Sequence, residues 1–368
     1  MNRERAFSLL DECGLDAVVA TTYENLTYMS GAYIYTQRTV PTRMSAILLT
    51  RNGDATYIFC SIEESLIRDQ TWIDDLRGYR EFAEDPMDIL AALLREKKLD
   101  GQRVGLERRS LGADHVGKLE LQGAAARYVD STGYFKKLRM IKTEAEITLL
   151  ERAATTTRKA VEAAFTAARP GDTEKRVANN IVHHLFDMGC DETAFITLAA
   201  GSNGSRAHHL PDESRLEPGQ IVRTDLGGYF AGYYSDLART YVVGEPSREQ
   251  ADTYRKLRGI YDEVIATMTV GRPVNVLYET CRAGFEREGL RFFMPHIGHS
   301  IGVELHEAPM VEPKEKTVLQ ENMVFNIEPF FRDAIGQGYH VEDLILITED
   351  GPRVLSGRLA AEELPVIG

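Results

Sequence analysis

The sequence predicts two domains, an α/β domain followed by a domain in which helices precede strands. Its 368 residues exceed the roughly 100–200 residues that one domain usually contains. Strand-like and helical patterns alternate up to residue 135, which is typical of an α/β layer. A long helical periodicity follows, and strand-like runs dominate from residue 220 onward. We therefore expect domains at 1–137 and 138–368.

Short apolar runs mark the strands of the first domain. Asn52-Gly53 separates two of them, and an Asn-Gly pair between strand-like runs predicts a β-hairpin. Strands are expected at 15–20, 44–49, 56–60 and 104–107, and an amphipathic helix at 85–97. No glycine-rich phosphate loop accompanies these runs.

Local signals define the start of the second domain. The basic segment 134–143 is expected to be an exposed connection. The apolar stripe of residues 147–165 predicts a helix that ends at Pro170, and Thr173 is placed to cap a second helix.

Two strand pairs are predicted beyond residue 220. Runs at 221–225 and 237–243 flank a segment rich in glycine and tyrosine, which predicts a hairpin with a bend. Runs at 323–330 and 339–348 form a second pair, and a turn at 349–352 leads into a last short strand.

Four acids fall in or beside these apolar strands, namely Asp225, Asp236, Glu328 and Glu342. A single strand acid is more often exposed at an edge or paired with a cation. Asp225 and Asp236, however, are expected to face each other across the first hairpin. Four buried carboxylates close together would repel one another and take up protons unless cations were present. The set therefore favours a site for divalent metal.

Histidines lie in two segments near the acids. His296, His299 and His306 fall within 295–309, where Gly298 and Gly302 allow the backbone to bend closely around His299. One imidazole among carboxylates suits Mn²⁺, Co²⁺, Fe²⁺ or Zn²⁺. His296 is as easily an ordinary hydrogen-bonded histidine.

A second histidine segment precedes the first metal strand. The loop at 200–209 is rich in glycine and delivers His208, which suits a proton donor or an oxyanion partner.

These residues together resemble a known family. The resemblance is to the pita-bread metallopeptidases. It rests on the segment GHSIGVELHEAP around His299 and on five residues in chain order, namely Asp225, Asp236, His299, Glu328 and Glu342. Within that family the chain resembles the prolidase-like branch of Xaa-Pro dipeptidases and aminopeptidases, which has a creatinase-like N-terminal domain. The resemblance implies an α+β pita-bread (creatinase/aminopeptidase-like) catalytic domain at 138–368. It also implies a small peptide as substrate and a homodimer.

The resemblance implies a role for each site residue. Asp225 would chelate one metal ion, His299 and Glu328 would hold a second, and Asp236 and Glu342 would bridge them. A metal-activated hydroxide would attack the scissile carbonyl. Glu328 would carry its proton to the leaving nitrogen. His208 and His306 match the positions of histidines that bind substrate and stabilise the tetrahedral intermediate, so both are candidate catalytic residues. Manganese or cobalt is expected first, with iron or zinc as alternatives.

Two positions depart from the family pattern. Ser300 follows the metal histidine where glycine is usual, and we expect little effect. His340 stands where many proline-specific members carry arginine, and strand alternation would place it on the face of Glu342, as a substrate-binding residue. The loss of a fixed charge keeps an alternative open, namely a hydrolase or lyase of a small non-peptide metabolite on the same dimetal scaffold. A non-catalytic binding module is disfavoured because all five ligands are present.

Composition excludes other classes of function. With 43 basic and 56 acidic residues the formal charge is −13, which argues against binding to nucleic acid or to an anionic membrane surface. The four cysteines are far apart and form no C-x-x-C pair, so buried free thiols are expected. The start of the chain has no apolar secretory segment, and a cytoplasmic location is expected.

Overall fold

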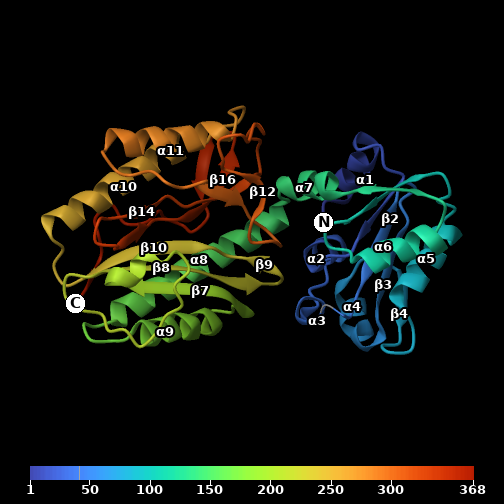
Figure 1. The fold of residues 1–368 in the computed structure, drawn as a ribbon, viewed down its shortest axis with the longest axis horizontal. Helices are drawn as coiled ribbons and strands as arrows, with labels where there is room; N and C mark the ends of the chain where they lie inside the picture. Colours follow the sequence, from blue (N-terminus) through green and yellow to red (C-terminus); the bar gives the residue numbers. More distant parts are fainter. Residues whose placement is uncertain (41) are drawn as a thin grey trace. The chain divides into compact units, whose positions relative to one another are not determined.

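The computed structural model describes residues 1–40 and 42–368. They form two compact units, Met1–Arg139 and Met140–Gly368, of mixed α/β structure (Figure 1). No helix among the described residues is long and apolar enough to cross a membrane.

The first unit is built on a six-stranded sheet in the order β4-β3-β2-β1-β5-β6. Its strands are β1 (Ala17–Ala20), β2 (Ala46–Thr50), β3 (Ala55–Cys60), β4 (Asp75–Tyr79), β5 (Arg103–Leu106) and β6 (Arg127–Asp130). Strands β2 and β3 are antiparallel neighbours, so the hairpin predicted from Asn52-Gly53 is confirmed.

Helices accompany this sheet. They are α1 (Arg3–Glu12), α2 (Tyr23–Ser30), α3 (Tyr35–Thr39), α4 (Glu64–Gln70), α5 (Pro86–Glu96), α6 (Ala113–Gln122) and α7 (Thr132–Met140), with a 3₁₀ turn η1 (Ser61–Glu63). The predicted helix at 85–97 is α5, which Asp85 caps by accepting a hydrogen bond from the Met87 amide. Its Leu90 and Leu94 share one core with Val19 and Ile58 of the sheet.

The expectation that 134–143 is an exposed connection is wrong. Most of it lies in α7, where Tyr134, Phe135 and Leu138 are buried. Lys142, which follows the helix, is fully buried as well, with its Nζ 2.6 Å from Glu307 Oε2. The basic residues of this segment suggest exposure to solvent. The charge of Lys142 can be buried because Glu307, 165 residues further along the chain, supplies a carboxylate that neutralises it.

The second unit repeats one arrangement, a helix pair followed by antiparallel strands. The first half has α8 (Glu144–Ala167) and α9 (Glu174–Asp187), and Thr173 caps α9 as predicted. The second half has α10 (Arg248–Ala266) and α11 (Asn275–Arg287). In Figure 1, α10 and α11 lie on one side of the strands of this unit and α9 on the other.

The strands of this unit form three sheets. One has the order β18-β10-β8-β7 with β9 beside β8, another has the order β12-β11-β13-β16-β17, and the third pairs β14 with β15. The first contains β7 (Glu192–Ala200), β8 (Ile221–Phe230), β9 (Tyr233–Tyr234), β10 (Leu237–Val243) and β18 (Val366–Ile367), and a 3₁₀ turn η2 (Gly201–Ser205) follows β7. The others contain β11 (Gly298–Ser300), β12 (Glu307–Met310), β13 (Val324–Ile327), β14 (Phe330–Arg332), β15 (Gly338–His340), β16 (Asp343–Thr348) and β17 (Gly351–Val354).

The structure corrects three strand predictions. Asp225 was expected to end its strand, but β8 continues to Phe230, so Asp225 lies in its middle. The runs 323–330 and 339–348 were each expected to be one strand, yet β13 and β14 belong to different sheets, and so do β15 and β16. The chain leaves one sheet after His340 and enters another at Asp343, and an apolar run does not reveal such a change of sheet.

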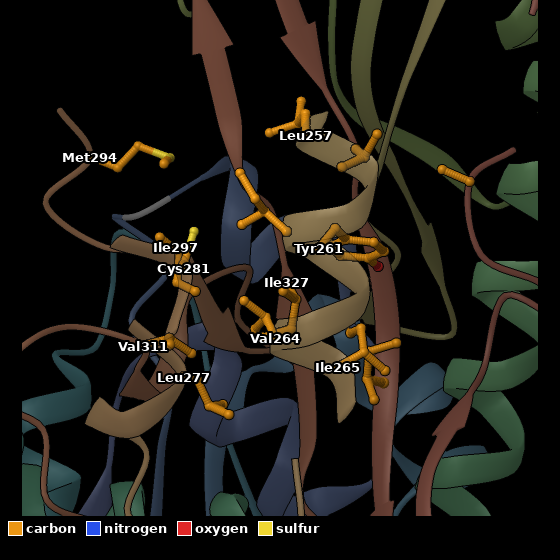
Figure 2. Packing of buried hydrophobic residues seen from close by; sticks show 14 of the residues in the cluster. Leu257, Tyr261, Val264, Ile265, Leu277, Cys281, Met294, Ile297, Val311 and Ile327 are labelled. Carbon is orange, nitrogen blue, oxygen red and sulfur yellow. The ribbon is translucent and has the colours of Figure 1, made fainter. Parts of the chain in front are cut away.

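Apolar packing fixes the helices against the sheets. Figure 2 shows Leu257, Tyr261, Val264 and Ile265 of α10 near residues of α11 and the sheet, among them Ile327. In the first half of this unit, buried side chains of α8 and α9 share a core with β7, β8 and β10. Strands β8, β10 and β13, which hold or adjoin site residues, therefore pack against helices.

Candidate metal centre

Strands β8 and β10 bring two of the predicted ligands together. Asp225 pairs with Ala238, and Asp236 precedes Ala238 by two residues, so both aspartates lie on one face of the sheet. The strands meet closely at Gly227, where a Cβ atom would lie 2.0 Å from the Ser235 carbonyl oxygen. Asp236 is 2% exposed, and its Oδ1 has no hydrogen-bond partner.

His299 on β11 is oriented as a ligand. Its Nδ1 lies 3.0 Å from the Ser300 carbonyl oxygen, so Nδ1 carries the proton and Nε2 the lone pair. Nε2 has no hydrogen-bond partner and lies 3.6 Å from both Asp236 Oδ2 and Glu328 Oε1. Burial lowers the pKa of His299 to about 4, which keeps the ring neutral.

Glu328 and Glu342 approach from β13 and from the link before β16. Asn326, opposite His299 in the β11–β13 register, donates a side-chain hydrogen bond to Glu342 Oε1. Glu342 Oε2 has no partner. Asp236, His299 and Glu342 each offer one ligand atom, and these three atoms lie within 4.8 Å of one another.

The electrostatics of this cluster are those of a site that lacks positive charge. Burial and the neighbouring carboxylates raise the pKa of Asp236 and Glu342 well above their usual range, and that of Asp225 to about 7. Glu328 differs because its pKa is lowered: burial opposes the shift, but His296, His299 and His340 outweigh it. Buried carboxylate oxygens and one neutral imidazole without partners suit divalent metal ions, so the residues fit the group that the sequence predicts.

Two glycines shape the segment around His299. A Cβ atom at Gly298 would lie 2.2 Å from the Asn326 carbonyl oxygen, and one at Gly302 would lie 2.7 Å from Glu307 Oε1. A side chain at either position would therefore collide with a neighbour, with β13 at Gly298 and with the buried Glu307 carboxylate at Gly302.

Other histidines lie near the predicted ligands. The His306 ring stacks on His299 with centroids 4.0 Å apart and planes 25° apart. His296 Nδ1 lies 3.4 Å from Glu328 Oε1, which raises the pKa of His296. His208 is exposed on the loop after η2, and it contributes, after burial and other neighbours, to the lowered pKa of His306.

His340 reaches the site, but not through strand alternation, because β15 ends at this residue. Its ring is 5% exposed, lies 5.6 Å from the Phe330 ring, and has no hydrogen-bond partner at either nitrogen. Burial lowers its pKa to about 4, against the pull of Glu328.

Comparison with known proteins agrees with this geometry. Residues 148–349 match the model of metallopeptidase family M24, and residues 3–141 match the creatinase/prolidase N-terminal domain. The chain belongs to metallopeptidase family M24. The predicted family and the pita-bread fold with a creatinase-like N-terminal domain are thereby confirmed.

Relatives of this M24 chain cover nearly its whole length. An Xaa-Pro dipeptidase from Lactobacillus helveticus is 30% identical over 316 residues, which are 84% of this chain and 85% of that protein. An Xaa-Pro dipeptidase from Pyrococcus horikoshii is 28% identical over 359 residues, 96% of each chain. The solved structure of an Xaa-Pro dipeptidase from Bacillus anthracis has a TM-score of 0.88 at 26% identity and covers 99% of this chain and 98% of its own.

Sequence reasoning missed three residues of this M24 site. His296 was left as an ordinary histidine, Asn326 was not considered, and neither was Arg223, which lies two residues before Asp225 on β8. For Arg223 a signal was available, because it stands two residues before Asp225 within β8 and so shares its strand face. Strand alternation gives no such signal for Asn326, because β13 ends at Ile327, before Glu328.

Another acid–histidine group exists among the described residues, made of Glu174, His209 and Asp212. Glu174 is fully buried, and its Oε1 accepts hydrogen bonds from the Ala200 amide and from Asn203 Nδ2. Its Oε2 lies 2.8 Å from His209 Nε2. With these partners the group is a structural anchor for the loop that carries His208.

Proposed function

We propose that this M24 metallopeptidase cleaves Xaa-Pro bonds, as a dipeptidase or an aminopeptidase, with two divalent metal ions at its centre. Asp225, Asp236, His299, Glu328 and Glu342 would hold the ions. The observation that carries the proposal is the convergence of buried ligand atoms without partners on Asp236, His299, Glu328 and Glu342. The names of the relatives support the substrate class.

The residues divide the chemical work between them. When bound, the metal ions lower the pKa of water and polarise a carbonyl. We assign to Glu328 the transfer of the proton to the leaving nitrogen, because its Oε1 lies within the cluster, 3.6 Å from His299 Nε2 and 3.4 Å from His296 Nδ1. We propose that His306 and His208 donate to the developing oxyanion. The stack of the His306 ring on His299 supports this role for His306, because it limits the orientation of the ring.

We propose that His340 contacts the substrate. An Xaa-Pro bond has no N–H, so recognition of the ring depends on the shape of the pocket and not on a hydrogen bond to that nitrogen. The His340 ring stands at 81° to the Phe330 ring, with 5.6 Å between the ring centroids. The pair offers a stiff wall for a five-membered ring.

The test is a substrate panel with metal-loaded protein. Ala-Pro and Ala-Pro-Ala should be hydrolysed at least about tenfold faster in kcat/KM than Ala-Ala and Ala-Ala-Ala, which is a difference of about 1.4 kcal/mol. No cleavage of any Xaa-Pro peptide by metal-loaded protein would contradict the proposal. The alternative of a non-peptide substrate stays open because His340 replaces a fixed charge. Hydrolysis of cyclic amides, without hydrolysis of Xaa-Pro peptides, would favour that alternative.

Finer points of the account stay predictions. The ligand set suits Mn²⁺ or Co²⁺, with Fe²⁺ or Zn²⁺ as alternatives. Metal analysis of protein purified without chelators checks this. The homodimer, the cytoplasmic location and the domain limits 1–137 and 138–368 are checked by sedimentation, cell fractionation and limited proteolysis.

A further inference from the structure

Arg223 is a buried cation next to the metal centre that the proposed mechanism does not use. It lies on β8, two residues before Asp225, and is 1% exposed. We propose that Arg223 is a positioning residue that holds the loop carrying His208 in its working place. The inference rests on the proposed function, because it assigns His208 a contact with substrate.

The hydrogen bonds of Arg223 point to the loop. Its Nη2 donates to the carbonyl oxygens of Arg206 and Ala207, the two residues directly before His208. Its Nη1 lies 3.5 Å from Thr197 Oγ1 on β7. One guanidinium thus connects two consecutive peptide groups of an irregular segment to the sheet.

A second anchor lies on the other side of His208. The next residue, His209, is buried against Glu174 of α9, with 2.8 Å between Nε2 and Oε2. His208 itself is exposed. The chain is therefore fixed just before and just after an exposed side chain, which limits where the His208 ring can go.

Arg223 also lies where the loop meets β15. A Cβ atom at Gly338 would lie 2.6 Å from the Gly204 carbonyl oxygen and 3.0 Å from Arg223 Cδ. The Arg223 guanidinium carbon lies 5.3 Å from the Phe330 ring centroid. The arginine stem fills the junction of the loop, β8 and β15, and each of these segments carries a site residue, namely His208, Asp225 and His340.

Direct recognition of substrate by Arg223 fits these contacts poorly. Nη2 is occupied by two carbonyl groups, and Nε is buried beneath Gly338. Its influence is expected to pass through the position of His208.

A double-mutant cycle tests this coupling. Arg223→Met keeps most of the stem and removes the donors, and it should lower kcat by about 10–100-fold through misplacement of His208. In the His208→Ala background the same change should cost less than about twofold, because the residue it positions is gone. Metal content should stay at the wild-type level, and Arg223→Lys should recover part of the rate.

A protease measurement reads the loop without any catalysis by the protein. Trypsin cleaves at the Arg206 carbonyl, which is one of the two groups that Arg223 holds. Arg223→Met should raise the cleavage rate at Arg206–Ala207 by at least about tenfold. Arg258→Gln is the matched control, since Arg258 is also a buried arginine that donates to a carbonyl, that of Ala360, and it should leave this rate unchanged.

The outcomes separate the two proposals. Absence of Xaa-Pro cleavage by the wild-type protein would overturn the proposed function, while the trypsin result would still decide whether Arg223 holds the loop. An equal loss of kcat in both backgrounds, a loss of metal, or unchanged cleavage at Arg206 would overturn the role of Arg223. If Arg223→Met does not fold, Arg223→Gln provides the same measurements.

Discussion

At the scale of single residues, the chemistry depends on atoms that have no partner inside the protein. His299 donates a hydrogen bond from Nδ1 to the Ser300 carbonyl oxygen, and its Nε2 lies near Asp236 and Glu328. The cluster of Asp236, His299 and Glu342 could be anticipated because strand acids and a glycine-flanked histidine are visible in the sequence. His296 was left open because its partner Glu328 lies on another segment. Arg223 was overlooked, although its position two residues before Asp225 on β8 is visible in the sequence.

Substitution of Asp236 should have the largest effect on activity and on bound metal. Asp236→Ala should abolish activity and lower the bound metal, because it removes a ligand from the centre of the cluster. Activity assays and metal analysis by mass spectrometry measure the two effects. Asp252→Asn on the exposed side of α10 is the control and should match the wild type. Full turnover by Asp236→Ala would refute its role as a ligand.

His208 should separate catalysis from metal binding. His208→Ala should retain wild-type metal and lose about 10²–10³-fold in kcat, the usual effect of removing one oxyanion donor. Steady-state kinetics and metal analysis decide. If the variant instead lost its metal, His208 would be a ligand and its present assignment would be wrong.

At the scale of elements, local signals were read correctly and distant ones were not. The Thr173 cap and the Asn52-Gly53 turn depend on neighbouring residues, and both are in place. The burial of Lys142, just after α7, was missed because it depends on Glu307, far along the chain. The break between β15 and β16 was missed because it is a change of sheet within one apolar run.

Gly227 should be essential to the β8–β10 approach. Gly227→Ala would place a methyl group 2.0 Å from the Ser235 carbonyl oxygen and should lower the free energy of unfolding by about 1–3 kcal/mol. Metal affinity should fall as well, because Asp225 and Asp236 flank this contact. Gly259→Ala on α10 is the control: its Cβ meets nothing within 4 Å, and helix propensity predicts a gain of up to about 1 kcal/mol. Equal stability of the two variants in urea denaturation would contradict the close approach.

At the scale of the whole molecule, part of the formal charge of −13 is concentrated in one buried centre. Acids with a raised pKa hold protons in the folded state that they release on unfolding, so they make stability fall as pH rises. The lowered pKa of His299 and His340 has the opposite effect, but only between about 4 and 6.5. The raised pKa values of Asp236 and Glu342 make stability fall as pH rises, and the raised pKa of His296 acts in the same direction.

Metal-free protein should therefore lose thermal stability as pH rises from about 6.5 to 8.5. Saturating Mn²⁺ or Co²⁺ should raise Tm at both ends of the range and more at the higher pH, because the cations bind the ionised carboxylates. Calorimetry of chelator-treated protein, with Mg²⁺ as a parallel addition, measures the shifts. A Tm that does not respond to Mn²⁺ or Co²⁺ at pH 8.5 would count against the buried cation site.

The most direct test of the account is a titration of metal-stripped protein with Mn²⁺, or separately Co²⁺, in which bound metal and Ala-Pro hydrolysis are followed in the same samples. We predict no hydrolysis without metal, and a rise to full activity as two ions bind to each chain. The same titration of Asp236→Ala should show fewer bound ions and no activity. Full activity of the stripped protein, or two bound ions per chain without hydrolysis of any Xaa-Pro peptide, would contradict the account.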